Sequence, residues 1–214
     1  MPHYINAKTP SEAWVRALEV IYRNGRDIMA GHEQKTREIL GLLIHIQKPF
    51  ENRLHPLYPL KEEAVRENYV PQLLTPENPT GFVYTYGERL RDYSVGEKRI
   101  DQINEVIRIL SDFKESRRAI AITWYPWVDL YAEDIPCLIV TDFKVRDNKL
   151  HLTCYLRSND LGEAWMANQY AFTELGKYVG EKIGVEMSSL TTFSNSAHYY
   201  EHFKPTVEKI LGIR

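Results

Sequence analysis

The stretch CLIVTDFKVRDNKLHLTCYLRSNDLGEAWMAN, residues 137–168, decides what the rest of the chain has to build. Its first half is typical of two strands, over residues 138–145 and 150–156, joined by a turn at Asp147 and Asn148. One face of the second strand is apolar throughout: Leu150, Leu152, Cys154 and Leu156. That face is expected to be buried, which makes Cys154 a core thiol.

The same stretch carries the residues with the richest chemistry. Cys137 is a candidate nucleophile, and Arg157 is a cation that could favour its thiolate. Ser158 and Asp160 can bind hydroxyls or anions, and the Asn168 amide can donate and accept hydrogen bonds at once. The other segments must explain why these side chains should meet.

The segments before this stretch indicate helices and strands in irregular alternation. Ser11 is expected to cap a helix whose apolar stripe ends at Asn24 and Gly25. Residues 40–46 alternate as a strand does, with Arg37 at its mouth. Residues 50–80 form a proline-rich excursion with a short helix over 61–69, and not a linker, because they carry many side chains that favour burial.

The remaining segments complete the prediction of fold. A structured region begins after Gly81, and the next elements are a helix over 99–113 and a strand over 119–124. A long helix over 163–182 ends at Gly184, and a strand-like segment then leads to His198 and a final helix. This order predicts an α+β fold with a mixed β-sheet covered by helices.

Composition narrows the class of protein. With 214 residues, 43% of them hydrophobic and 26% charged, the chain is expected to form one domain over residues 1–214. A net charge of −2 argues against DNA or general nucleic-acid binding. The apolar runs are too short for a membrane span and the start of the chain lacks signal-peptide features, so a cytoplasmic location is expected. In that compartment Cys137 and Cys154 are expected to be free thiols.

Conventional motifs do not account for the candidate residues. The chain has no Walker loop, no GxGxxG, no GxSxG and no paired CxxC. His198 and His202 have a helical metal-ligand spacing, but no third ligand accompanies them, and no metal is predicted.

The order and spacing of the polar residues resemble the thymidylate synthases, in the compact form found in archaea. The resemblance covers about residues 81–205, and the step of twenty residues from Cys137 to Arg157 and that of eleven from Arg157 to Asn168 are both those of the family. The matching segments are Tyr84-Thr85-Tyr86-Gly87, Asp101-Gln102-Ile103, Ser116-Arg117-Arg118-Ala119, Trp124, Pro136-Cys137, Arg157-Ser158-Asn159-Asp160, Asn168 and Ala197-His198-Tyr199-Tyr200.

This resemblance implies a reaction and a nucleophile. The family methylates dUMP reductively, with a methylene-tetrahydropterin as donor of both carbon and hydride. Cys137 matches the cysteine that adds to C6 of the pyrimidine, and Arg157 matches the arginine that favours its thiolate and touches the phosphate. Tyr86 matches a tyrosine implicated in removing the C5 proton.

The resemblance also implies a shared substrate site. Ser158 matches a phosphate ligand, and Arg117 and Arg118 match arginines that reach the partner's nucleotide across a sheet-to-sheet homodimer. Arg37 is a candidate for a further phosphate arginine. The residues that read the nucleoside and the pterin have matches too: Asn168 for uracil, His198 and Tyr200 for the deoxyribose 3′ hydroxyl, and Asp160 for the pterin.

Departures from the family pattern leave three points open. Leu138 replaces the usual His, Leu156 replaces the usual Gln, and a long C-terminal segment that closes over folate is not expected, so the carrier is either a tetrahydrofolate or a methanopterin-type pterin. The catalytic glutamate could be Glu62, Glu63 or Glu67. The rival functions are a pyrimidine nucleotide (dUMP or dCMP) hydroxymethylase, in which water captures the same intermediate, and a non-catalytic nucleotide- or RNA-binding relative.

Overall fold

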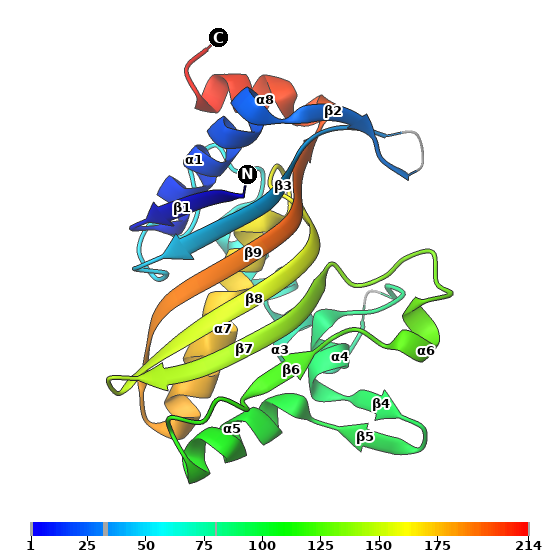
Figure 1. Ribbon diagram of the computed structural model, residues 1–214, viewed down its shortest axis with the longest axis vertical. Coiled ribbons are helices and arrows are strands. Elements are labelled where there is room, and N and C mark those ends of the chain that lie inside the picture. The colour runs from blue at the N-terminus through cyan, green and yellow to red at the C-terminus, as the bar shows by residue number, and fades with distance from the viewer. Residues whose placement is uncertain (1, 32–33, 80, 214) are drawn as a thin grey trace.

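The computed structural model describes residues 2–31, 34–79 and 81–213, and its central feature is a seven-stranded mixed sheet (Figure 1). The strand order is β1-β3-β9-β8-β7-β6, with β2 added to β3. β1 runs parallel to β3 and β8 parallel to β9, whereas the other neighbours in this sheet are antiparallel. The strands of this sheet are β1 (His3–Ala7), β2 (Arg26–Met29), β3 (Lys35–Ile46), β6 (Ile120–Ile122), β7 (Leu138–Arg146), β8 (Lys149–Asp160) and β9 (Glu186–Tyr200). The predicted α+β fold with a mixed sheet is confirmed.

Helices cover one face of this sheet. Figure 1 shows α7 behind β7, β8 and β9, with α1 and α8 at one end and α5 at the other. In the described part of the chain, no helix crosses the opposite face. The helices are α1 (Pro10–Asn24), α2 (Glu62–Ala64), the π-helical turn η2 (Val65–Tyr69), α3 (Pro71–Leu74), α4 (Tyr86–Arg91), α5 (Gln102–Asp112), α6 (Pro126–Asp129), α7 (Trp165–Ile183), the 3₁₀ turn η3 (Glu201–Phe203) and α8 (Lys204–Ile210). A hairpin of β4 (Tyr93–Val95) and β5 (Lys98–Ile100) stands apart from the sheet.

The core lies between this sheet and α7, as the alternation in β8 predicts. Leu150, Leu152, Cys154 and Leu156 are all fully buried, so the assignment of Cys154 as a core thiol is confirmed. The turn before them works because Asp147 (φ 50°) and Asn148 (φ 56°) adopt left-handed backbone that these residue types tolerate. Gly184 (φ 69°) ends α7 in the same region of φ.

Three predicted boundaries are wrong for local reasons. α1 begins at Pro10 and is capped by Thr9, whose side chain accepts from the Glu12 N–H, so Ser11 lies inside the helix. The helix predicted over 99–113 begins at Gln102, because Asp101 caps it and the residues before it pair in the β4–β5 hairpin. β3 begins at Lys35, which places Arg37 inside the strand instead of at its mouth.

The proline-rich excursion over 50–80 folds back onto the core. Its short helix is present as α2 and η2, and Val65 and Leu73 are buried there in the main core cluster. The excursion thereby brings η2 and α3 against α7. None of the helices in the described residues is long and apolar enough to cross a membrane.

Candidate active site

Cys137 lies at the end of the sheet, directly before β7, and its thiol is partly exposed. The backbone holds it beside β8, because the Arg157 N–H donates to the Cys137 carbonyl at 2.8 Å. The twenty residues from Cys137 to Arg157 thus span the β7–β8 hairpin. Because β8 runs antiparallel to β7, the chain comes back to lie beside Cys137 at Arg157.

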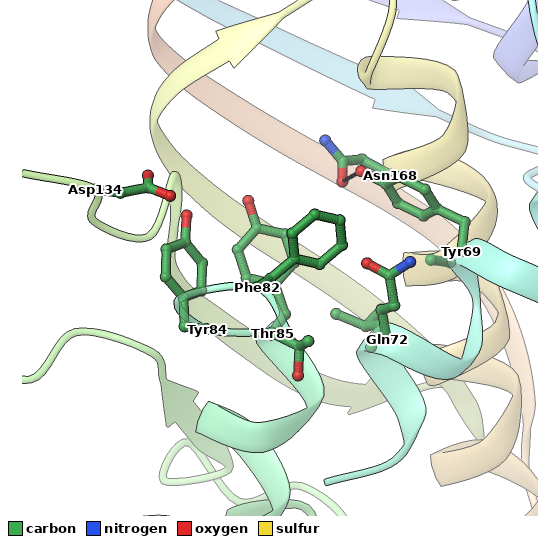
Figure 2. Close-up of a pocket in the computed structure, with 10 residues that line it drawn as sticks. Tyr69, Gln72, Phe82, Tyr84, Thr85, Asp134 and Asn168 are labelled. Atoms are coloured by element: carbon green, nitrogen blue, oxygen red, sulfur yellow. Dashed lines mark hydrogen bonds between the residues drawn. The ribbon is translucent and has the colours of Figure 1, made fainter. Parts of the chain in front are cut away.

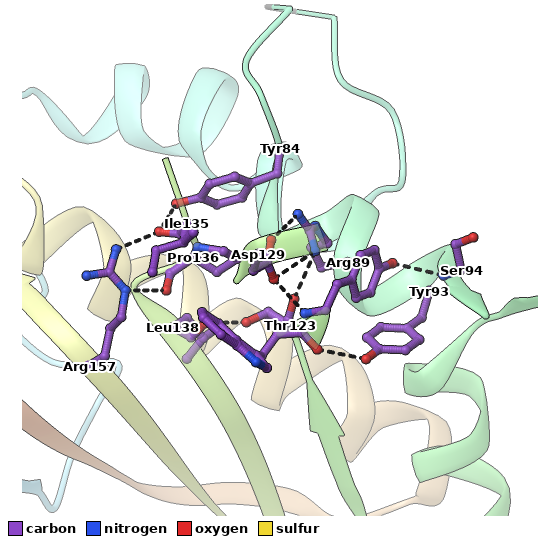
Figure 3. Close-up of polar contacts among 12 residues, drawn as sticks. Tyr84, Arg89, Tyr93, Ser94, Thr123, Asp129, Ile135, Pro136, Leu138 and Arg157 are labelled. Carbon is purple, nitrogen blue, oxygen red and sulfur yellow. Dashed lines mark hydrogen bonds and ion pairs between the residues drawn. The ribbon is translucent and has the colours of Figure 1, made fainter. Parts of the chain in front are cut away.

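The Arg157 side chain fastens the segment that precedes the thiol. Its Nε donates to the Pro136 carbonyl at 2.9 Å, and its Nη2 donates to the Ile135 carbonyl at 2.7 Å (Figure 3). The Tyr84 hydroxyl donates to the same Ile135 carbonyl at 3.1 Å. Two charge-assisted bonds and one phenol therefore hold the backbone on which Cys137 depends.

The pKa of the Cys137 thiol is set by opposing effects, of which burial is the largest. Burial raises the pKa of Cys137 above its ordinary value, the Arg157 guanidinium lowers it, and Asp134 and Asp160 raise it again. Arg157 acts in the predicted direction, yet its charge is not enough to bring the pKa below the ordinary value. The thiol is consequently mostly protonated at neutral pH.

Three phenols gather around the thiol, next to a cavity of about 200 Å³. Burial is the first cause that raises the pKa of Tyr69, Tyr84 and Tyr86, and nearby Cys137 raises each of them further. The Tyr86 oxygen accepts from the Leu138 N–H at 3.3 Å. The cavity is lined by Tyr69, Gln72, Leu73, Phe82, Tyr84, Thr85, Tyr86, Asp134, Asn168 and Ala171 (Figure 2).

Asn168 projects into this cavity from the first turn of α7 and is 5% exposed. Its Oδ1 accepts from the Tyr69 hydroxyl at 2.8 Å. Figure 2 shows the amide nitrogen on the side away from Tyr69. The predicted reader amide and the phenols around the thiol therefore belong to one cavity.

Asp160, His198 and Tyr200 lie on neighbouring strands at the same end of the sheet. Asp160 pairs with His198 in the β8–β9 register, and the Tyr200 ring meets the His198 ring edge-on at 5.4 Å. Burial raises the pKa of Asp160 to about 6, although its carboxylate accepts from the Gly162 and Glu163 N–H groups. Burial lowers the pKa of His198. The structure thus brings together Cys137, Tyr86, Arg157, Ser158, Asp160, Asn168, His198 and Tyr200 at this end of the sheet.

Arg117 and Arg118 lie elsewhere in the same protomer. They are exposed and directly precede β6, where Ile120 pairs with Asp142 of β7. Cys137 lies at the opposite end of β7. At about 3.3 Å per residue, the pair of arginines is about 20 Å from the thiol of its own chain.

Arg37 is bonded to residues outside the cavity. Its Nη1 pairs with Asp27 at 2.8 Å and its Nε donates to the Tyr22 carbonyl of α1, so the structure does not bring it to the cavity. Side chains directly opposite in a sheet share a face. Arg26 opposes Glu38, which opposes His198, so Arg26 and not Arg37 is on the face of His198.

The three candidate glutamates do not line the cavity. All of them are exposed on α2 and η2. The Glu62 carboxylate accepts from the Tyr170 hydroxyl at 3.0 Å, and Glu67 pairs with Arg66. Tyr69, from the same excursion, is hydrogen-bonded to Asn168.

A buried ion pair behind the cavity has no signal in the sequence. Arg89 donates to Asp129 at 2.9 Å and packs over the Tyr125 ring at 3.8 Å, and both charged side chains are buried (Figure 3). The Arg89 guanidinium also lies 5.5 Å from the Tyr84 ring centre. This pair ties α4 to α6 and so supports the wall that carries Tyr84.

His202 contacts two neighbouring side chains. Its Nε2 lies 3.1 Å from a Glu163 oxygen, and its ring stacks on Tyr200 at 5.7 Å. Across the described residues, no group of three or more His, Cys, Asp or Glu side chains is placed to hold a metal ion.

A partly buried thiol, an arginine beside it and an inward-facing amide thus lie together at one end of the sheet. The thymidylate synthase family model matches residues 72–212. Similar proteins named "Putative thymidylate synthase" come from Methanosarcina mazei (44% identical, covering 97% of this chain and 94% of the relative) and Methanothermobacter marburgensis (34%, covering 98% and 99%). A third, from Methanocaldococcus jannaschii, is 34% identical over 90% of this chain and 89% of its own. This chain therefore belongs to the thymidylate synthase family, which implies a transferase with a folate-type co-substrate.

Proposed function

We propose that this protein methylates dUMP reductively to dTMP through a covalent bond between the Cys137 sulfur and C6 of uracil. The observation that carries the proposal is the convergence of Cys137, clamped by Arg157, with the Asn168 amide beside one cavity. Phosphate binding alone would not need a thiol. A thiol beside a base-reading amide fits addition to a pyrimidine.

The Cys137 thiol gives its proton to a nearby carboxylate, Asp134 or Asp160, as its sulfur bonds to C6, because its raised pKa keeps it protonated until then. The electron pair of the C5–C6 bond then makes C5 nucleophilic. Because Tyr86 is itself protonated, its oxygen takes up the C5 proton as its own hydroxyl proton passes to water in the cavity, and the sulfur departs from C6 with its electron pair once the new carbon is in place. Tyr86 is fitted to this role by its bond to the Leu138 N–H, which fixes its oxygen one residue from the thiol.

The nucleotide is bound along the end of β8 and β9. Ser158 and Arg157 contact the phosphate, and His198 with Tyr200 holds the 3′ hydroxyl of the sugar. Arg26 takes the place first assigned to Arg37, since Arg26 is on the face of His198. The Asn168 Nδ2 donates to O4 of uracil while Oδ1 accepts from N3–H.

The cavity beside Asn168 holds the carbon carrier. Phe82 is 55% exposed and together with Tyr84 offers aromatic surface for a planar ring, and Gln72 offers an amide. Asp160 remains a hydrogen-bond partner for the pterin, and its pKa of about 6 leaves it mostly ionised at pH 7. When bound, the carrier supplies the one-carbon unit and the hydride. Both tetrahydrofolate and methanopterin-type carriers share the pterin that these residues would contact.

The working unit is a homodimer of single-domain chains that meet through the helix-free face of the sheet. That face exposes apolar side chains on two strands: Ile120 and Tyr155 are 50% and 36% exposed. Arg117 and Arg118 are too far from their own thiol to touch its nucleotide. They would complete the partner's site.

Mass spectrometry after incubation with 5-fluoro-dUMP and each methylene-tetrahydropterin tests the proposal. We expect a ternary covalent adduct on Cys137 that disappears in Cys137→Ser, whereas no adduct with any reduced pterin would leave the non-catalytic alternative. Products from unfluorinated dUMP separate the two enzyme functions, since dTMP and hydroxymethyl-dUMP differ in mass.

A further inference from the structure

In the part of the chain that the structure describes, one side chain, a phenol, bonds to the Asn168 amide. The Tyr69 hydroxyl donates to Oδ1 at 2.8 Å, and Asn168 is 5% exposed, so most of the amide is screened from bulk water. Burial, followed by the nearby Tyr58 and Cys137, raises the pKa of Tyr69 above its ordinary value. The phenol therefore keeps its proton and remains a donor across the whole neutral range.

The direction of this bond matters because a side-chain amide has two ends of nearly equal shape. Rotation by half a turn exchanges its donor and its acceptor. Uracil presents an acceptor at O4 and a donor at N3–H, whereas cytosine presents a donor at its amino group and an acceptor at N3. An amide free to rotate could satisfy either base.

In this structure the Tyr69 hydroxyl occupies one lone pair of Oδ1 and leaves Nδ2 on the far side of the amide (Figure 2). Oδ1 keeps a second lone pair for N3–H, and Nδ2 is directed to an acceptor such as O4. The rotated amide could only donate from Nδ2 to the phenol oxygen, and the Tyr69 hydroxyl proton would then lose its acceptor, since no other acceptor for it is present among the described residues. Tyr69 is placed for this contact by η2, the π-helical turn that it ends, in which the Val70 N–H reaches the Val65 carbonyl.

We propose that Tyr69 is a positioning residue that fixes the orientation of the Asn168 amide and thereby makes the site choose uracil over cytosine. This inference rests on the proposed function. It assigns to a tyrosine the contact with the reader amide, in a segment where the sequence offered only Glu62, Glu63 and Glu67.

Calorimetric titration of three ligands tests this role without any carrier: dUMP, dCMP and 2-deoxyribose 5-phosphate, which has no base. Tyr69→Phe keeps the ring and its packing and removes only the hydroxyl. We expect the ratio of dUMP to dCMP affinity to fall about tenfold in Tyr69→Phe, the worth of one buried hydrogen bond. The affinity for 2-deoxyribose 5-phosphate should not change.

The matched control is Tyr93→Phe, which removes a hydroxyl that donates to the Trp124 carbonyl at 2.7 Å outside the cavity. It should keep all three affinities. A second arm combines Tyr69→Phe with Asn168→Asp. Because no amide is left to orient in Asn168→Asp, the loss of the phenol should no longer alter the ratio there.

The outcomes separate the inference from the function on which it rests. A wild-type preference for dUMP that survives undiminished in Tyr69→Phe would overturn the inference alone. Wild-type protein without any preference for dUMP over dCMP would overturn the proposed function and the inference with it. A fall in the ratio that is equally large in the Asn168→Asp background would overturn the claim that Tyr69 acts through Asn168.

Discussion

Replacing Arg157 by Gln should slow the alkylation of Cys137 at mildly alkaline pH. The guanidinium is the cation that lowers the pKa of this thiol against burial, Asp134 and Asp160, so its loss lets the pKa rise further. A neighbouring arginine shifts an acid by about one to three pKa units, and because Arg157 is only half-buried we take the lower end. Below the pKa, a rise of about one unit leaves about tenfold less thiolate.

Iodoacetamide alkylation measured from pH 7 to pH 10.5 gives the assay. Cys154 is fully buried, so the reaction reports Cys137, and Cys137→Ser provides the blank. We expect Cys137 to react about tenfold more slowly in Arg157→Gln than in wild type at pH 8. The two rates should converge towards pH 10.5, where Cys137 ionises in both proteins. Arg99→Gln, which removes an exposed arginine paired with Asp92, is the control and should follow wild type.

Coincident rate profiles for wild type and Arg157→Gln would refute the reasoning. They would mean that Arg157 acts on the site only through its bonds to the Ile135 and Pro136 carbonyls. The loss of those two bonds can be measured separately. It should lower the Tm at every pH and leave the alkylation rate of the folded protein unchanged.

Three further predictions concern assembly, pH and stability. Mixing Cys137→Ser with Arg118→Ala chains, each inactive alone, should recover about a quarter of the wild-type rate, since half of randomly formed dimers hold one intact site; a mixture that stays inactive would contradict the shared site. Burial raises the pKa of Asp160 from about 3.8 to about 6 in the folded protein. Wild type should therefore lose stability relative to Asp160→Asn as the pH rises from 4 to 6, and the difference should stay constant above pH 6. A difference in Tm that is the same at pH 4 and pH 8 would contradict this. Asp129→Asn leaves the Arg89 guanidinium buried without its counter-charge and should cost about 3 kcal/mol in urea unfolding, against less than 1 kcal/mol for an exposed pair.

Burial affects the pKa of the Cys137 thiol more than the charge of Arg157 does. The resemblance assigned Arg157 to thiolate formation, and the structure shows the same residue mainly fastening the backbone before Cys137. Burial outweighs the charge. A reaction that begins from a protonated thiol needs a group that removes the proton during attack. The carboxylates near the thiol, Asp134 and Asp160, could accept that proton.

The sequence by itself determined those features that depend on near neighbours in the chain. Alternation along β8 shows its buried face, Gly184 marks the end of α7, and the spacing from Cys137 to Arg157 to Asn168 carries the family. Each follows from a periodicity or a spacing that does not depend on how distant segments pack.

Only the tertiary structure showed that Arg37 is held away from the cavity and that Tyr69 is the partner of Asn168. Arg26 and Arg37 stand on the same hairpin, and the pairing of β2 and β3 with β9 alone puts them on opposite faces. Tyr69 meets Asn168 across 99 residues of chain because η2 packs against α7. A local pattern cannot show which side of a sheet a polar residue faces once both sides are packed, and it cannot show which distant segment will cover it.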